Sequence, residues 1–266
     1  MKKYFIMFRI KFSNSMRYKT SVVFAIFTQI IWSLMNIFLF DIFYRSTNDA
    51  CLSFDNTRVY LWFEGIFLPL FALWMLDEDI IKSIINGNIA YELVKPINVY
   101  WVWFSRNISS RLSKFIIRSC PVLILAIFLP QNYNLPRFGS YIFFPFFILS
   151  TILATILLVA LSMLIYILTC RFLSYGGIKS LASKIVSFLS GGVIPLPFFS
   201  KKLKFLLSFT PFPYIQNTAI KIYIGNIGIY EVLFNIFMQV LWISVIVLLG
   251  IYFKNKVFEK IVIQGG

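Results

Sequence analysis

Apolar segments long enough to cross a membrane alternate with short polar segments along most of the chain. A run of about 20 apolar residues is typical of a transmembrane helix, because a helix pairs its own backbone polar groups inside the lipid. The pattern predicts an all-α polytopic membrane protein that forms a single domain over residues 1–266. We expect six transmembrane helices, at residues 21–44, 59–76, 115–130, 140–169, 178–196 and 230–253.

The polar stretch between the second and third spans has the pattern of a short amphipathic helix. Asp77, Glu78 and Asp79 place negative charge where the start of a helix is electrically positive. Gly87 fits the left-handed position that closes such a helix, and Pro96 ends the segment that follows. An apolar stripe at one-turn spacing is formed by Ile80, Ile81, Ile84 and Ile85. On this pattern alone, the helix either rests on the lipid headgroups or is contacted by a soluble partner.

Two segments of the chain each carry several basic residues at regular intervals. Residues 1–20 predict an interfacial helix on the inner leaflet, with an apolar face formed by Phe5, Phe8, Phe12 and Met16. Arg111, Lys114 and Arg118 recur at helical spacing at the start of the third span. We expect this basic stripe to contact lipid phosphates, with Arg118 extending toward the membrane surface. Contact with a soluble partner is the second interpretation.

The segment between the fifth and sixth spans, residues 195–229, combines four prolines with a short apolar run at residues 205–209. That run is too short to cross a bilayer. Irregular backbone at membrane depth is tolerated only where it is buried in protein or lines a cavity. We therefore expect a re-entrant or interfacial hairpin on the outer face, with an ordinary aromatic-rich loop as the alternative.

Composition agrees with a membrane location and excludes several activities. The chain is 59% hydrophobic with a net charge of +15, and its basic residues lie at the ends of apolar segments. We expect them to face anionic lipid and not nucleic acid. The chain has no histidine, its three cysteines lack metal-ligand spacing, and it has no phosphate-binding loop motif. We therefore expect no catalytic residue, no metal and no cofactor bound by this chain.

The positions of Lys and Arg predict the orientation. Eighteen lie on one face of the expected topology and seven on the other. Because basic residues concentrate in cytoplasmic loops, both termini are expected in the cytoplasm. Frequent lysine, asparagine and isoleucine are typical of an AT-rich bacterium, so we expect a bacterial plasma membrane.

Four residues within the expected spans are candidates for a substrate path: Glu64, Asn36, Phe67 and Phe188. Glu64 lies about 8 Å below the outer end of the second span. Its carboxylate can recognise a cationic substrate, pair across a subunit interface, or reach the outer headgroups, and the last interpretation is favoured. For Gln29, Ser33 and Asn36 in the first span, hydrogen bonds between helices are favoured over substrate contacts.

At three places the sequence resembles the six-span permease subunit of type-2 ABC exporters. These are GNIAYELVKPINVYW at residues 87–101, FLSGGVIPLPFFSKKLKFLLSFTPFPYI at residues 188–215, and the terminal QGG at residues 264–266. The resemblance covers nearly the whole chain, with the motifs in the right order.

This resemblance implies a function and a set of partners. Such permeases pair with an identical or related permease and with two separate ATPase subunits, which bind ATP and magnesium. Here the segment that couples to the ATPase maps to residues 77–98, with the sites Asp77, Glu78, Ile80, Ile81, Ile84, Ile85, Gly87, Asn88, Tyr91, Glu92, Lys95 and Pro96. The outer gate maps to Ser190, Gly191, Gly192, Pro195, Pro197, Pro211 and Pro213. Residues 1–20 match the interfacial elbow helix, and the exported substrate is expected to be a hydrophobic or amphipathic drug, lipid or peptide.

We expect the coupling helix to act as a rigid lever between two conformations. Gly87 and Pro96 would set its angle, and the isoleucine stripe would hold it to the ATPase. Two other classes of function stay open. An intramembrane enzyme would need a catalytic set that the sequence does not offer, and a non-transporting membrane scaffold or immunity factor would need no ATPase.

The native cysteines test the predicted orientation. Cys51 lies in an expected outer loop and Cys170 beside an expected inner loop. In single-cysteine variants, a membrane-impermeant thiol reagent applied to intact cells is expected to label Cys51. It should leave Cys170 unlabelled until the membrane is opened. The reverse pattern of labelling would contradict the orientation.

Overall fold

The computed structural model describes residues 2–15, 19–46, 52–172, 175–225 and 227–259. Within these residues the regular secondary structure is helical, with no strand, as the sequence predicts. The predicted positions Met16 and Cys51, and the QGG motif at residues 264–266, lie outside the described residues.

Six longer helices and several short ones make up the described part of the chain. The longer helices are α2 (Lys19–Ser46), α3 (Phe54–Phe71), α6 (Val99–Phe128), α7 (Phe144–Phe172), α8 (Tyr175–Leu189) and α11 (Ile229–Phe258). The shorter α-helices are α1 (Lys2–Ser15), α4 (Glu78–Ile85), α5 (Ile89–Leu93), α9 (Lys201–Ser208) and α10 (Asn217–Ile224). Three single 3-10 turns are η1 (Tyr141–Phe143), η2 (Leu196–Phe198) and η3 (Phe212–Tyr214).

Three segments in the described part of the chain are long and apolar enough to cross a membrane: Val22–Ser46, Tyr141–Phe172 and Ile229–Phe258. They correspond to the first, fourth and sixth expected spans. The other three expected spans correspond to α3, α6 and α8, which are more charged or shorter. Helix α8 ends at Leu189, earlier than expected, and its 15 residues extend over about 22 Å. Helix α6 is continuous over 30 residues, so the third expected span is the second half of a longer helix.

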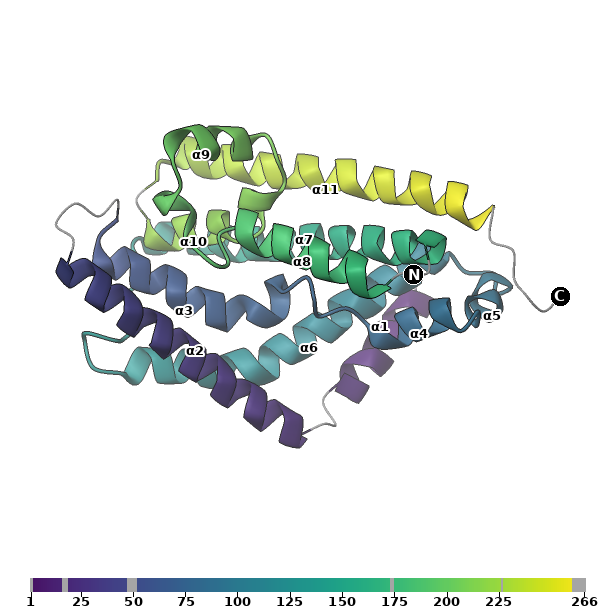
Figure 1. Cartoon of the computed structure of the whole chain (residues 1–266), viewed down its shortest axis with the longest axis horizontal. Coiled ribbons are helices and arrows are strands. Elements are labelled where there is room, and N and C mark those ends of the chain that lie inside the picture. Colours follow the sequence, from purple (N-terminus) through teal and green to yellow (C-terminus); the bar gives the residue numbers. More distant parts are fainter. Residues whose placement is uncertain (1, 16–18, 47–51, 173–174, 226, 260–266) are drawn as a thin grey trace.

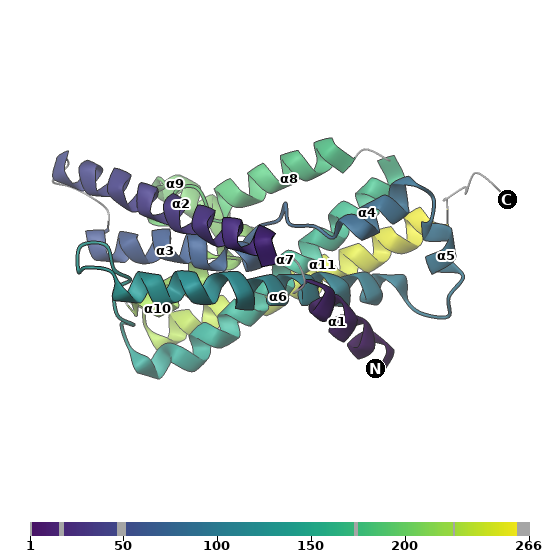
Figure 2. The same ribbon diagram turned by 90° about the horizontal axis from the view of Figure 1, so that it is seen from below.

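Helix α7 lies at the centre of the arrangement. It packs against α11, α10, α6, α8 and α4, while α3 packs against α6 and α2 lies on both of them. Helix α1 lies against α6. Figures 1 and 2 both place α4, α5 and the C-terminal end of α11 at one end of the molecule, and α9 and α10 toward the other. We call these the α4–α5 end and the α9–α10 end.

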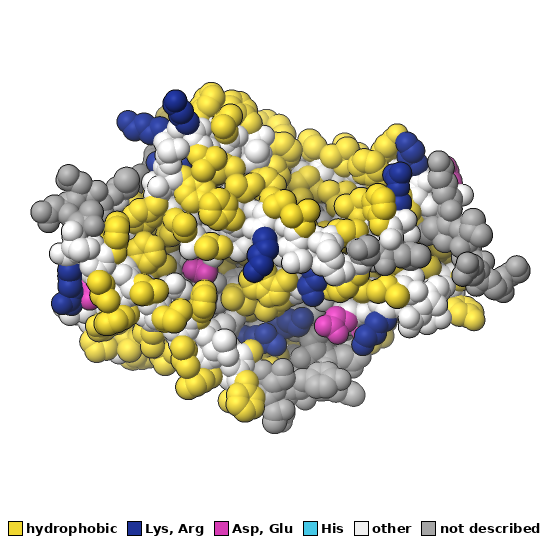
Figure 3. Space-filling model, in the orientation of Figure 1, with side chains coloured by type: hydrophobic (Ala, Val, Ile, Leu, Met, Phe, Trp, Pro, Cys, Tyr) yellow, Lys and Arg dark blue, Asp and Glu magenta, His cyan; other side chains and the backbone are white. Residues whose placement is uncertain are grey.

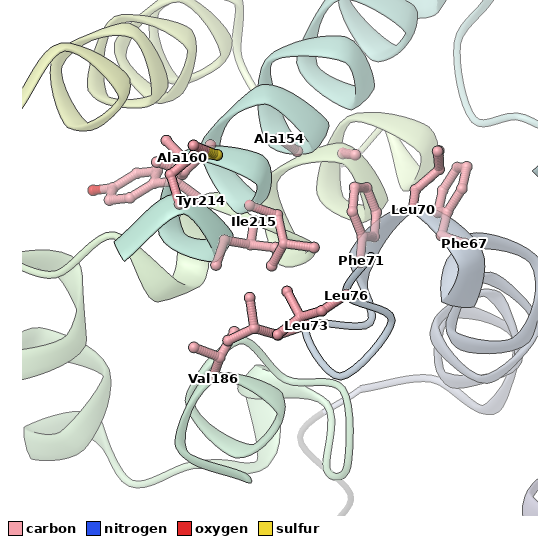
Figure 4. Close-up of a cluster of buried hydrophobic side chains, with 14 of the residues drawn as sticks. Phe67, Leu70, Phe71, Leu73, Leu76, Ala154, Ala160, Val186, Tyr214 and Ile215 are labelled. Carbon is pink, nitrogen blue, oxygen red and sulfur yellow. The ribbon is translucent and has the colours of Figure 1, made fainter. Parts of the chain in front are cut away.

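The interior is filled mainly by apolar side chains from helices that are distant in the sequence. Figure 4 shows one buried cluster formed by α3 and the turn after it, α7, α8 and the η3 segment. Its labelled members are Phe67, Leu70, Phe71, Leu73, Leu76, Ala154, Ala160, Val186, Tyr214 and Ile215. In a membrane such clusters stabilise the fold through close van der Waals packing and not through exclusion of water.

The outer surface suits a lipid environment. Hydrophobic side chains cover most of the face in Figure 3, and basic side chains stand out over α9 and toward the C-terminal end of α11. Large exposed apolar side chains are numerous on α2 and α11, the helices that flank the bundle. An apolar surface of this extent is not stable in water, so the chain is a membrane protein.

Helices α2 and α3 approach each other closely at Gly65. A Cβ atom at this position would lie 2.2 Å from Ser33 Oγ but 3.5 Å from Ser33 Cβ. The first distance is a steric overlap and the second is an ordinary contact. Gly65 therefore permits the approach of α2 at the level of Ser33.

Replacing Gly65 tests this packing. Gly65→Ala is expected to destabilise the protein by about 1–3 kcal/mol, because the new methyl group overlaps the Ser33 hydroxyl. Adding Ser33→Ala removes the overlapping atom and should restore most of the loss. Thermal unfolding in detergent measures both effects. Equal destabilisation with and without Ser33→Ala would contradict the proposed contact.

Candidate functional site

Helix α4 begins and ends as its sequence predicts. Asp77 is the N-cap residue, and its Oδ1 accepts a hydrogen bond from the Asp79 backbone N–H at 3.1 Å. Gly87 has φ +73°, the left-handed conformation that ends the helix. The following helix, α5, ends at Leu93, before Pro96. The predicted amphipathic helix is confirmed.

The isoleucine stripe of α4 faces the protein interior. Ile80, Ile81 and Ile84 are buried in the core, on a helix that packs against α7. In contrast, Ile85 is 50% exposed. The expectation that the whole stripe holds a soluble partner is therefore wrong for the three buried isoleucines. Their apolar face is already covered within this chain, and they anchor α4.

The exposed side of α4 and α5 forms a mixed surface at one end of the molecule. Its protruding apolar side chains are Ile85, Tyr91 and Val94, of which the last two are 74% and 86% exposed. They are surrounded by the exposed polar residues Glu78, Asp79, Lys82, Asn86, Asn88, Lys95 and Asn98. We call these ten residues the α4–α5 surface. Apolar side chains within a polar rim are typical of a protein–protein contact.

Glu92 fixes α5 relative to its neighbours. Its Oε2 accepts a hydrogen bond from Trp103 Nε1 at 2.7 Å, and its Oε1 accepts one from Ser83 Oγ at 3.3 Å. The carboxylate therefore joins α5 to α6 and α4. The sequence placed Glu92 at the ATPase contact, whereas the structure directs its charge to this internal junction.

A hydrogen-bonded chain connects the start of α4 to the centre of the molecule. The Asp77 backbone N–H donates to Tyr166 Oη at 2.7 Å, and Asn107 Nδ2 donates to the same oxygen at 2.9 Å. Arg111 Nε then donates to Asn107 Oδ1 at 2.8 Å. All four residues are buried. With Ser162, they form what we call the Arg111 network.

Arg111 itself joins three helices. Its Nη1 donates to the carbonyl oxygens of Leu70 at 3.0 Å and Ala72 at 2.9 Å, and its Nη2 donates to Ser162 Oγ at 3.3 Å. The two carbonyls lie at the C-terminal end of α3, where the helix dipole favours a cation. Arg111 is 1% exposed, so the expectation that it contacts lipid phosphates is wrong.

Arg106 adds a second connection at the start of α4. Its guanidinium lies 3.3 Å from Asp77 Oδ2 and 3.7 Å from Asp79 Oδ2. Sequence reasoning missed the roles of Arg106, Asn107 and Tyr166. The available signal was the four-residue spacing of Asn107 and Arg111, which places both on one face of α6.

At the α9–α10 end, the residues assigned to the outer gate lie in two adjoining segments. Gly191 has φ +87° in the turn after α8, where Ser190 is buried. A Cβ at Gly192 would lie 3.2 Å from Gln216 Oε1, so this turn closely approaches the start of α10. The prolines assigned to the gate flank or lie within η2 and η3, on either side of α9: Pro195, Pro197, Pro211 and Pro213.

Buried polar contacts hold the η3–α10 segment against the long helices. Gln239 Nε2 of α11 donates to the Tyr214 carbonyl at 2.8 Å and to Ser150 Oγ of α7 at 3.0 Å. Tyr60 Oη of α3 donates to Asn217 Oδ1 at 2.7 Å. Gln239 was not identified from the sequence, because a single glutamine in an apolar helix gives no indication of its partner.

Tyr223 attaches α10 to the loop before α7. Its hydroxyl donates to the Pro136 carbonyl at 2.9 Å. Burial, and then the nearby Tyr141, raises the pKa of the Tyr223 phenol to about 12. The phenol therefore stays protonated and keeps its role as a donor at physiological pH.

The four residues assigned to a substrate path do not form one cluster. Phe67 is buried and stacks on Phe63 at 4.8 Å, inside the core. Phe188 packs on Phe199 at 5.3 Å near the end of α8. Glu64 Oε1 accepts a hydrogen bond from the Trp32 side chain at 3.3 Å. Asn36 Nδ2 donates to the Trp32 backbone carbonyl at 3.0 Å, which is a contact within α2 and does not place Asn36 beside Glu64.

The described residues offer no metal site, since no three Cys, Asp or Glu side chains among them come close enough to hold an ion.

A comparison with protein families assigns the chain. The family model described as "ABC-2 family transporter protein" matches residues 30–265, nearly the whole length. None of the curated proteins compared with the chain matches it. The matched region contains α3 to α11 and therefore both ends of the molecule described above. The chain belongs to the ABC-2 family of membrane transport proteins.

Proposed function

We propose that this chain is the membrane-spanning subunit of an ATP-driven exporter for a hydrophobic or amphipathic drug, lipid or peptide. It would work with a second permease, identical or related, and with two separate ATPase subunits that bind ATP and magnesium. Its own role is conduction and not catalysis. The observation that carries the proposal is the α4–α5 surface on a chain of the ABC-2 family.

In the proposed arrangement six helices cross a bacterial plasma membrane, with α3, α6 and α8 added to the three apolar spans. Charged residues make α6 and α3 less apolar than the other spans, and some of these charges are paired or enclosed within the protein. Arg111 is enclosed by protein, and Arg58 pairs with Asp55 near the start of α3. An enclosed and hydrogen-bonded charge can lie at membrane depth. The α4–α5 end and both termini would face the cytoplasm, in agreement with the distribution of Lys and Arg.

The ATPase would bind at the α4–α5 surface through Ile85, Tyr91 and Val94. The buried isoleucines and Glu92 make α4 and α5 a rigid unit, which is what a lever needs. Movement of this unit would pass to the transmembrane helices through the Arg111 network, since the network joins α4 to α3, α6 and α7. ATP binding would then favour one conformation of the bundle over the other.

The exit would lie at the α9–α10 end. The turn at residues 190–192 and the proline-flanked η2 and η3 turns, with α9 between them, would form a re-entrant outer segment over the bundle. The bonds from Gln239 and Tyr60 would hold this segment on α11 and α3. Opening would require these contacts to change together, which couples the exit to the long helices.

A charge at Ile85 tests the proposed ATPase contact. Ile85→Glu should reduce copurification of the ATPase at least tenfold, because it places a charge in the centre of an apolar contact. It should leave the permease folded, because Ile85 is half exposed. Copurification and ATP hydrolysis are measured together.

Phe205→Glu is the matched control, since Phe205 is 65% exposed on α9 at the opposite end. Loss of ATPase binding in the control, or undiminished binding and hydrolysis in Ile85→Glu, would contradict the assignment.

Removing the Tyr166 hydroxyl tests transmission through the Arg111 network. Tyr166→Phe keeps the ring but removes the acceptor for Asp77 and Asn107, at a cost of about 1–3 kcal/mol. The ATPase should still bind, while substrate exported per ATP hydrolysed falls severalfold.

The control is Tyr175→Phe, because the Tyr175 hydroxyl is buried without a hydrogen-bond partner in the described part of the chain. An unchanged ratio of export to hydrolysis in Tyr166→Phe, or the same fall in both variants, would argue against the network as the connection.

A further inference from the structure

One carboxylate interrupts the apolar surface of α3. Between Thr57 and Phe71 every residue of this helix is buried except Glu64 and Leu68, which are partly exposed and one turn apart. Figure 3 shows an isolated acidic patch within the hydrophobic surface over α3. The partly exposed side of α3 therefore presents a carboxylate and a leucine.

The position of Glu64 along α3 argues against the interpretation that was favoured from the sequence. Helix α3 begins at Phe54 and not at residue 59, so Glu64 lies about 15 Å along the helix. In a hydrocarbon layer of about 30 Å, a helix that crosses as proposed carries this carboxylate near the middle. At that depth it would not reach the outer headgroups.

The carboxylate has one neutral partner. Trp32 Nε1 of α2 donates to Glu64 Oε1 at 3.3 Å. No Lys or Arg nitrogen of the described residues lies within ion-pair distance of it. An ionised carboxylate at membrane depth without a nearby cation is costly, so Glu64 is either protonated or balanced by a cation from outside the described part of this chain.

The surroundings of Glu64 suit an ammonium group. Trp32 is 48% exposed, and the face of an indole ring attracts cations while its N–H orients the carboxylate. On α2, Gln29 and Ser33 are buried with side-chain polar atoms that have no hydrogen-bond partner in the described residues. Ser33 Oγ faces Gly65, the residue after Glu64.

We infer that Glu64 and Trp32 form a binding site for the ammonium head of a cationic amphiphile. The carboxylate would neutralise the positive charge, and the indole face would lie against the head group. The tail would lie along the exposed apolar side chains of α2, such as Ile31 and Met35, and on Leu68 of α3. If the chain is the proposed exporter, this site defines its substrate class as cationic amphiphiles. The role of the site in transport therefore rests on the proposed function. Binding itself needs no ATPase.

The experiment measures binding to the whole chain in phosphatidylcholine nanodiscs, without any ATPase. The probe is radiolabelled dodecyltrimethylammonium, and empty nanodiscs give the background. Saturable binding is expected, and neutral dodecanol or anionic dodecyl sulfate should not compete for it. Glu64→Gln should weaken binding about 10- to 150-fold, because a charge-assisted interaction is lost. Trp32→Phe should weaken it less, by about 2- to 30-fold.

Two controls separate the site from general effects. Glu231→Gln changes a carboxylate at the start of α11 that already pairs with Lys221 at 3.5 Å, and it should bind the probe as the wild type does. Glu64→Asp keeps the charge and should retain part of the affinity. Each variant is compared with the wild type by gel filtration to confirm that it folds.

Three results would overturn the inference. Equal binding by Glu64→Gln, or equal competition by dodecanol, would show adsorption to the apolar surface only. No saturable binding, together with a changed oligomeric state in Glu64→Gln, would show that Glu64 pairs with a basic residue of a second subunit instead. If the probe binds but no ATPase copurifies with the chain, the result counts against the proposed exporter function and not against the binding site. The two proposals can therefore fail separately.

Discussion

The fold depends on a buried cation whose hydrogen bonds are made to protein groups. The Arg111 guanidinium lies among α3, α6 and α7, and its partners come from all three helices. Leaving such a charge unpaired costs roughly 3–5 kcal/mol, a large fraction of the stability of a typical domain. The end of α3 is therefore held at a fixed place between α6 and α7. Through Asn107 and Tyr166 the same restraint reaches the first residue of the α4 segment.

At both ends of the molecule, buried polar side chains fix a short segment by hydrogen bonds, but the groups involved differ. At the α4–α5 end, charged and amide groups hold a short helix that presents an exposed surface. At the α9–α10 end, Gln239 holds irregular backbone against two long helices by its side-chain amide. In both places a few buried polar groups orient a segment that is too short to cross a membrane. Because these groups are buried, the loss of one partner leaves the other unsatisfied, so each short segment is tied to the long helices that it contacts.

The sequence was sufficient where a local rule decides the structure. Asp77 and Gly87 limit α4 as expected, because capping depends on the nearest residues only. The isoleucine stripe of α4 was also correctly identified. The surface that covers it was not, because the sequence pattern does not show whether α7 or a partner protein packs against the stripe. Arg111 was assigned to lipid because periodicity shows which face a residue occupies and not what lies opposite. Its carbonyl partners are some forty residues distant in the chain, at Leu70 and Ala72.

The central claim is that a partner ATPase contacts the α4–α5 surface, from which the network reaches the bundle. The most direct measurement places a photo-crosslinking amino acid at Tyr91, an exposed residue of α5, and identifies what it captures in living cells. The account predicts an ABC ATPase subunit as the crosslinked partner. Capture of lipid alone at Tyr91, with an ATPase captured instead from a site on α9, would contradict it.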